Sequence, residues 1–171
     1  MGLRPEGAYN NFHERLAYSL KDEEQINQIY FKKFRNVTKV ESVVDLGLQA
    51  LGIDKIVYLT SGHKISIEEK KRTKGYTDVL FEEYSCFEKK TPGWIEKDLF
   101  PHYLCYIIMP KQTAYLFPFH LLQTAYLNNK EIWLGTYNRM FAQNKTYKTS
   151  NIAVPLEAVL RALHQEMITG F

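Results

Sequence analysis

The stretch IDKIVYLTSGHKISIEEKKR (53–72) predicts a β-hairpin. Residues 53–60 are rich in β-branched and aromatic residues, which favour a strand. Ser61-Gly62 is typical of a turn, and residues 63–72 alternate in polarity as a second strand would. Two strand runs joined by so short a turn are expected to pair with each other.

Two acidic side chains of this hairpin are expected to meet. Asp54 begins the first strand, and Glu68 and Glu69 lie on the second. Counting back from the turn, Asp54 lies opposite residue 68 or 69, depending on the length of the loop. Residues directly opposite have Cβ atoms about 4.5–5.5 Å apart. The two carboxylates would therefore repel each other unless one takes up a proton or a cation binds between them.

Strand alternation favours Glu68 over Glu69 as the partner of Asp54. Side chains alternate between the two faces of a strand, so the isoleucines at 65 and 67 lie opposite a polar set. We expect the isoleucines to face the core and the polar set to face a cleft. A two-residue turn would instead place Glu69 opposite Asp54. The polar set comprises Ser66, Glu68, Lys70 and Arg72.

A pair of carboxylates suits Mg²⁺ or Mn²⁺, because such cations take carboxylates together with waters and substrate phosphate. Asp54 and Glu68 are predicted to hold the metal, with the carbonyl of Glu69 as a further ligand. The cation would polarise a phosphodiester and lower the pKa of a bound water. Lys70 would orient the attacking water and stabilise charge developing on phosphorus, and Arg72 would clamp a phosphate oxygen. The alternative is an exposed Glu–Lys ion pair that contributes little.

The rest of the chain predicts one α/β domain with a mostly antiparallel or mixed sheet. Residues 1–18 are expected to be a loose lead-in to a single domain over residues 19–171. Residues 38–47 fit either a short strand or a turn. The other expected elements are a helix over 21–35, a strand over 77–85, a loop over 90–101, a hairpin over 102–117, and helices that open at Pro118 and Pro155.

Composition limits the classes of function. A net charge of +3 permits a nucleic-acid partner without requiring one. The 12 Tyr and 10 Phe residues suit a core first and base-stacking surfaces second. Two cysteines are too few for a disulfide framework. No apolar run approaches the roughly 20 residues of a membrane helix, and no signal peptide is evident, so a soluble cytoplasmic protein is expected.

Five motifs occur along the chain in a specific order. They are QALGID (49–54), ISIEEKKR (65–72), YTDVLFEEYS (76–85), TPGWI (91–95) and YKTSNIAVP (147–155). Together they resemble the PD-(D/E)XK nuclease superfamily, in particular its small bacterial and phage branch. The resemblance implies a restriction-endonuclease-like fold, a mixed β-sheet flanked by helices, that hydrolyses DNA. It also implies that Asp54, Glu68 and Lys70 are catalytic, with Asp78 and Glu82 as supporting acids.

Residues 134–149 interleave cations, rings and amides, as a nucleic-acid groove would. The predicted contacts are Tyr137, Arg139, Lys145 and Lys148, and the alternative is a flexible polar loop. The expected partner is DNA, with RNA as an open alternative. Two other classes of function remain: a nucleic-acid-binding module of the same fold without turnover, and an interaction or structural domain whose hairpin acids pair with lysines.

Overall fold

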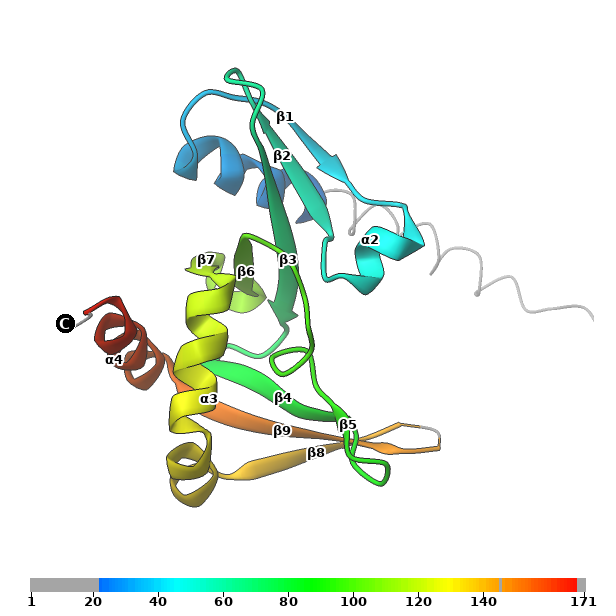
Figure 1. Cartoon of the computed structure of the whole chain (residues 1–171), viewed down its shortest axis with the longest axis vertical. Coiled ribbons are helices and arrows are strands. Elements are labelled where there is room, and N and C mark those ends of the chain that lie inside the picture. The colour runs from blue at the N-terminus through cyan, green and yellow to red at the C-terminus, as the bar shows by residue number, and fades with distance from the viewer. Residues whose placement is uncertain (1–21, 145, 169–171) are drawn as a thin grey trace, which may run out of the picture. The chain divides into compact units, whose positions relative to one another are not determined.

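The computed structural model describes residues 22–144 and 146–168, so the expected lead-in (1–18) and Lys145 lie outside the described residues. The chain divides into two compact units, and Figure 1 traces the elements of both. The first unit comprises Met1–Val40 and Val57–Lys64, and the second comprises Glu41–Ile56 and Ile65–Phe171. The candidate catalytic residues all belong to the second unit.

The first unit contains the predicted N-terminal helix, which is helical over residues 22–33. Ile26 and Tyr30, one helical turn apart, are both buried. The unit also holds the tip of the first hairpin. There the Leu59 N–H donates to the carbonyl oxygen of His63 (3.0 Å), which leaves a three-residue turn over 60–62. Gly62 has φ +84°, the left-handed conformation that closes such a turn.

A mixed five-stranded sheet contains the predicted hairpin strands. The segment over 38–47 supplies a strand and then the short helix α2 (Leu46–Ala50). The third and fourth strands of the sheet are parallel, with Glu68 opposite Leu104, and the fourth and fifth form the predicted second hairpin. The order is β1 (Val37–Ser42), β2 (Lys55–Leu59), β3 (Lys64–Arg72), β6 (Tyr103–Ile108) and β7 (Thr113–Pro118).

A second, antiparallel sheet has four strands, whereas the sequence predicted a single sheet. Its order is β5 (Thr91–Pro92), β4 (Asp78–Cys86), β9 (Lys148–Pro155) and β8 (Arg139–Gln143). The alternative of a flexible loop over 134–149 does not hold where β8 pairs with β9. Tertiary partners order this hairpin: Phe141 packs edge-on against Phe87, with ring centroids 5.0 Å apart. The stabilisation from such tertiary contacts cannot be predicted from local sequence periodicity.

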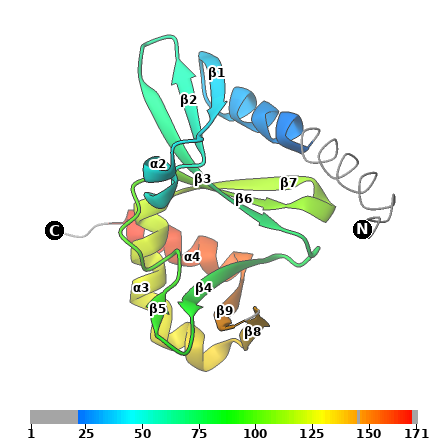
Figure 2. The same ribbon diagram turned by 90° about the vertical axis from the view of Figure 1, so that its right-hand side faces the viewer.

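Two helices cover the core of the second unit. Helix α3 (Phe119–Thr136) and helix α4 (Leu156–Met167) each begin directly after a proline, as predicted. Figure 2 shows the two helices packed next to β4 and β9. Phe81 of β4 stacks on Trp133 of α3 with centroids 5.6 Å apart. The mixed α/β class is therefore confirmed. Within the described residues, no helix is long and apolar enough to cross a membrane.

Candidate functional site

The backbone fixes Asp54 at the base of the first hairpin. Its N–H donates to the carbonyl oxygen of Ile67 (2.8 Å), and its carbonyl oxygen accepts from the N–H of Val43 (2.8 Å). The carboxylate oxygen Oδ2 accepts from the backbone N–H of Glu69 at 2.8 Å. Asp54 is thus held across from residues 67–69, within the range predicted by counting back from the turn.

Glu68 and Lys70 meet Asp54 in a largely buried cluster. Only 5% of Glu68 is exposed, and the Lys70 Nζ donates to its Oε1. Burial raises the pKa of the Glu68 carboxyl, whereas the charge and hydrogen bond of Lys70 lower it. The charge of Asp54 and a side-chain hydrogen bond with it raise the same pKa. Two carboxylates and one ammonium therefore share one small volume, with contacts between Glu68 and both neighbours.

The polar face of β3 is not the open cleft that strand alternation predicted. Ser66, Glu68 and Arg72 on this face are all buried, as is Ile67 on the other face. Both faces of β3 are therefore covered at these positions. Lys70 is the exception, since 34% of its side chain is exposed. The approach to the cluster from solvent is therefore along Lys70.

Trp94 lies beside the ammonium group of Lys70, at 5.9 Å from Nζ to the ring centroid. That distance is within the range of a cation–π interaction. Trp94 is also buried and stacks on Phe81 at 5.8 Å. Trp94 therefore combines a packing role with a contact to the candidate catalytic lysine. The Pro-Gly-Trp motif was the available signal for this contact.

Gly93 allows the loop that carries Trp94 to press against strand β4. Its N–H donates to the carbonyl oxygen of Glu83 at 2.8 Å. A Cβ at Gly93 would lie 1.8 Å from the carbonyl oxygen of Glu82, a distance that no side chain can accept. Glycine is therefore required here because the two backbones approach so closely. This contact with β4 also fixes the position of the next two residues, Trp94 and Ile95.

Gly93→Ala is expected to destabilise the protein by about 2–3 kcal/mol, because backbone rather than a flexible side chain meets the new methyl group. Urea or thermal unfolding measures the change. Gly135→Ala is the matched control: it lies inside α3 with nothing within 4 Å of the new Cβ, and a gain of up to about 1 kcal/mol is expected. Unfolding of Gly93→Ala at the wild-type midpoint would show that β4 does not hold this loop.

The donor set of the cluster fits a hard divalent cation with water-rich coordination. Asp54 and Glu68 supply two carboxylates, the number that Mg²⁺ commonly takes from protein. Glycine at position 52 avoids crowding the cluster, because a Cβ there would lie 3.3 Å from Glu68 Oε2 and 2.9 Å from Leu99 Cδ1. Among residues 22–144 and 146–168, no group of three or more His, Cys, Asp or Glu side chains is placed to hold a metal. Any further ligands would be backbone, water or phosphate oxygens.

The residues predicted to support catalysis are placed differently. Arg72 donates through Nε and Nη2 to the two carboxylate oxygens of Asp78, at 3.1 and 3.2 Å. This two-pronged pair occupies the guanidinium that was expected to clamp phosphate. Glu82 lies on β4 where Gly93 packs against its backbone. The buried acid of this strand is its neighbour Glu83, which sequence reasoning did not single out.

The residues predicted to contact nucleic acid have different surroundings in the described part of the chain. Arg139 donates to the buried Glu83 at 2.8 Å, so its charge is already paired. Tyr137 packs against the core at the end of α3. Lys148 is exposed at the start of β9, and Lys145 lies outside the described residues.

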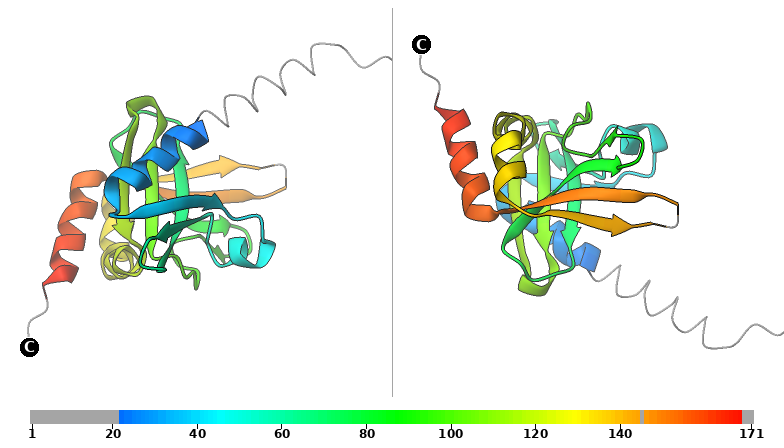
Figure 3. Two further views of the ribbon diagram at one scale, coloured as in Figure 1. Left: turned by 90° about the horizontal axis from the view of Figure 1, so that it is seen from above. Right: turned by 90° about the horizontal axis from the view of Figure 1, so that it is seen from below.

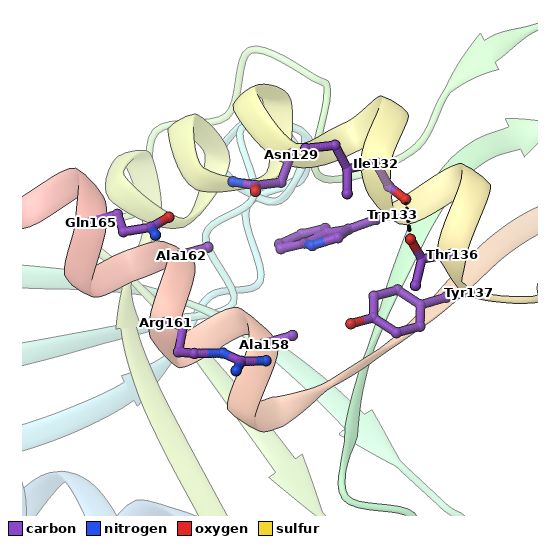
Figure 4. A pocket seen from close by; sticks show the side chains of 9 residues that line it. All are labelled: Asn129, Ile132, Trp133, Thr136, Tyr137, Ala158, Arg161, Ala162 and Gln165. Carbon is purple, nitrogen blue, oxygen red and sulfur yellow. Dashed lines mark hydrogen bonds between the residues drawn. The ribbon is translucent and has the colours of Figure 1, made fainter.

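A hollow of about 400 Å³ lies between α3 and α4, and Tyr137 lines it (Figure 4). Trp133, Arg161 and Gln165 are among the other lining residues, and none of the nine is acidic. The hollow therefore lacks the carboxylates that metal-assisted hydrolysis needs. The cluster around Glu68, in contrast, contains two carboxylates.

Comparisons with family models, with curated proteins and with solved structures give no significant match to this chain. The residues of the cluster and the order of the motifs are therefore the features of this chain that bear on its function.

Proposed function

We propose that this protein is a metal-dependent nuclease that hydrolyses phosphodiester bonds in DNA, with Mg²⁺ or Mn²⁺ as cofactor. The observation that carries the proposal is the meeting of the Asp54 and Glu68 carboxylates beside Lys70. Burying two like charges next to each other costs free energy. A purely structural role would not require two carboxylates at this place. A cation between the carboxylates would offset that cost. The order of the motifs supports the same class of enzyme.

Asp54 and Glu68 would hold the cation. When bound, it supplies positive charge to the phosphate and lowers the pKa of a coordinated water. The Glu69 N–H orients the Asp54 carboxylate through its 2.8 Å hydrogen bond. Lys70, the most exposed member of the cluster, would move from Glu68 toward the phosphate and orient the attacking water. The ring of Trp94 limits the positions open to the Lys70 ammonium and reduces its contact with water.

One observation favours a second candidate, a nucleic-acid-binding module without turnover. The Lys70–Glu68 ion pair satisfies the buried carboxylate without any cation. If that pair persists, Lys70 is not available for chemistry. The two candidates differ in their response to divalent metal.

Mg²⁺ or Mn²⁺ is expected to raise the melting temperature of the wild-type protein, because a ligand that binds only the folded state stabilises it. At one hundred times the dissociation constant the gain is about 2.7 kcal/mol, or roughly 5–10 °C for a domain of this size. Asp54→Asn should lose most of this shift. The measurement is thermal unfolding with EDTA and then with increasing metal. An equal metal response of both proteins would remove the proposed site.

Cleavage decides between the two candidates once binding of metal is established. Single-stranded, duplex and branched DNA should be incubated with the wild-type protein and each metal, with Asp54→Asn as the control. Metal-dependent products from wild type alone support the nuclease. A protein that takes up metal at Asp54 and never cuts would favour the binding module.

A further inference from the structure

Aromatic side chains form a row across the second sheet, away from the carboxylate cluster. Tyr84 of β4 and Phe141 of β8 both pair with Ser150 of β9, with a register shift in β4 just before Tyr84. Phe87, in the turn after β4, packs edge-on against Phe141 and lies 5.9 Å from Tyr84. Half of Phe141 is exposed, although its ring packs against Phe87.

Lys90 lies over these rings in a strained conformation. Its ammonium is 3.9 Å from the centroid of Phe87 and 4.8 Å from that of Tyr84. Its φ is +54°, in the left-handed region that normally favours glycine or asparagine. This backbone conformation costs free energy in a lysine, and the contacts of the side chain with the two rings offset that cost. We call Tyr84, Phe87, Lys90 and Phe141 the aromatic–lysine surface.

The charge around the aromatic–lysine surface is mostly positive. Lys89 and Lys148 flank it and are exposed, and the only acid of the turn over 87–90 is Glu88. Glu88 is engaged in part, since its Oε2 accepts the backbone N–H of Lys148 at 3.1 Å. The nearby Arg139 is neutralised by Glu83. An anionic partner is therefore favoured.

The aromatic–lysine surface adjoins the candidate active site through the Pro-Gly-Trp loop. Pro92 of β5 pairs directly with Tyr84, and Trp94 lies two residues further along. Two extended residues span about 7 Å, and Trp94 contacts Lys70. Figure 3 shows the β8–β9 hairpin extending beyond α3 and α4, whereas Lys130 of α3 lies 6.0 Å from the ring centroid of Tyr84. A strand of nucleic acid that lies on the hairpin would run toward Lys70.

We propose that the aromatic–lysine surface binds a single-stranded segment of nucleic acid, with a base stacked on Phe141 and a phosphate paired with Lys90. The inference rests on the proposed function, and it narrows the substrate to DNA with unpaired nucleotides beside the cut. Unpaired bases present faces on which aromatic side chains stack. Duplex bases already stack on one another and leave only phosphates within reach. A protein partner is disfavoured because lysine is depleted at such interfaces.

Binding of fluorescein-labelled oligo(dT), oligo(U) and a duplex of equal length tests the inference by fluorescence anisotropy. The wild-type protein should bind the single strands more tightly than the duplex. Phe141→Ala should weaken single-strand binding about tenfold, the scale of one lost stacking partner, and leave duplex binding unchanged. Lys90→Ala should flatten the salt dependence, because one phosphate contact is lost. A difference in affinity between oligo(dT) and oligo(U) identifies whether the surface prefers DNA or RNA.

Met140→Ala is the matched control. Met140 is the neighbour of Phe141 with similar exposure, and it lies on the opposite face of β8. The Met140→Ala protein should bind single strands as tightly as the wild-type protein. Circular dichroism should show that both variants are folded. Equal losses for Phe141→Ala and Met140→Ala, or equal losses on single strand and duplex, would overturn the inference. So would wild-type protein that binds neither single strand.

The inference and the proposed nuclease can fail separately. If the wild-type protein cuts DNA with metal but Phe141→Ala binds single strands normally, the aromatic–lysine surface is wrong and the nuclease stands. If Phe141 controls single-strand binding and no metal supports cleavage, the nuclease is wrong and the surface stands.

Discussion

Glu68→Gln is expected to abolish metal-dependent DNA cleavage, whereas Glu69→Gln should retain much of it. The Glu68 carboxylate is buried in contact with Asp54 and Lys70. Glu69 contributes its backbone N–H to Asp54, and a glutamine at 69 keeps that donor. The measurement is single-turnover cleavage by each variant with Mg²⁺ and with Mn²⁺. Glutamine retains the size of glutamate, so the comparison isolates the charge.

Stability provides the control for the Glu68 variant. Burial raises the folded-state pKa of Glu68 above its ordinary value of 4.5. Its contribution to stability is therefore fully present below pH 4.5 and is lost as the pH rises through the folded-state pKa. Without divalent metal, Glu68→Gln should melt above wild type at pH 8, and the difference should shrink toward pH 4. Inactivity together with this added stability excludes misfolding as the cause.

The reverse pattern of losses would change the assignment of the site. If Glu69→Gln is inactive and Glu68→Gln still cuts, the metal is held by Asp54 and Glu69. The assignment of Glu68 from the three-residue turn over 60–62 and from its burial would then be wrong.

Lys70→Ala is expected to slow single-turnover cleavage by about 10²-fold or more, the scale of one lost electrostatic donor. DNA affinity should change little, because Lys70 is proposed to act on charge that develops only in the transition state. Cleavage rates at saturating protein and a separate binding titration make the distinction. A parallel loss of affinity and rate would assign Lys70 to ground-state binding instead.

Lys71→Ala is the matched control for this prediction. Lys71 is the next residue on β3, but it is exposed and its side chain lies on the opposite face. The net charge of the two variants is the same, so non-specific attraction to DNA falls equally in both. The cleavage rate of Lys71→Ala should stay within a few-fold of wild type. Equal rate losses would mean that bulk charge rather than position matters.

The sequence predicted the elements whose causes are local. Alternating polarity on both sides of Ser61-Gly62 predicted the first hairpin, and Pro118 and Pro155 marked the starts of α3 and α4. The hairpin in turn brought Asp54 within reach of residues 68 and 69, because the side chains of paired strands have fixed spacing. Strand alternation then favoured Glu68, the glutamate that is buried with Asp54 in the structure.

The surroundings of that site depended on residues outside the hairpin. The partner of Arg72 is Asp78, in a different sheet, and the neighbour of Lys70 is Trp94 on a loop held by β4. Likewise, strand β8 has little apolar alternation of its own and is ordered by Phe87 and Glu83. Periodicity and turn chemistry are properties of neighbouring residues, so they specify local conformation. Which distant side chain neutralises a charge or covers a ring is decided only when the sheets and helices pack together.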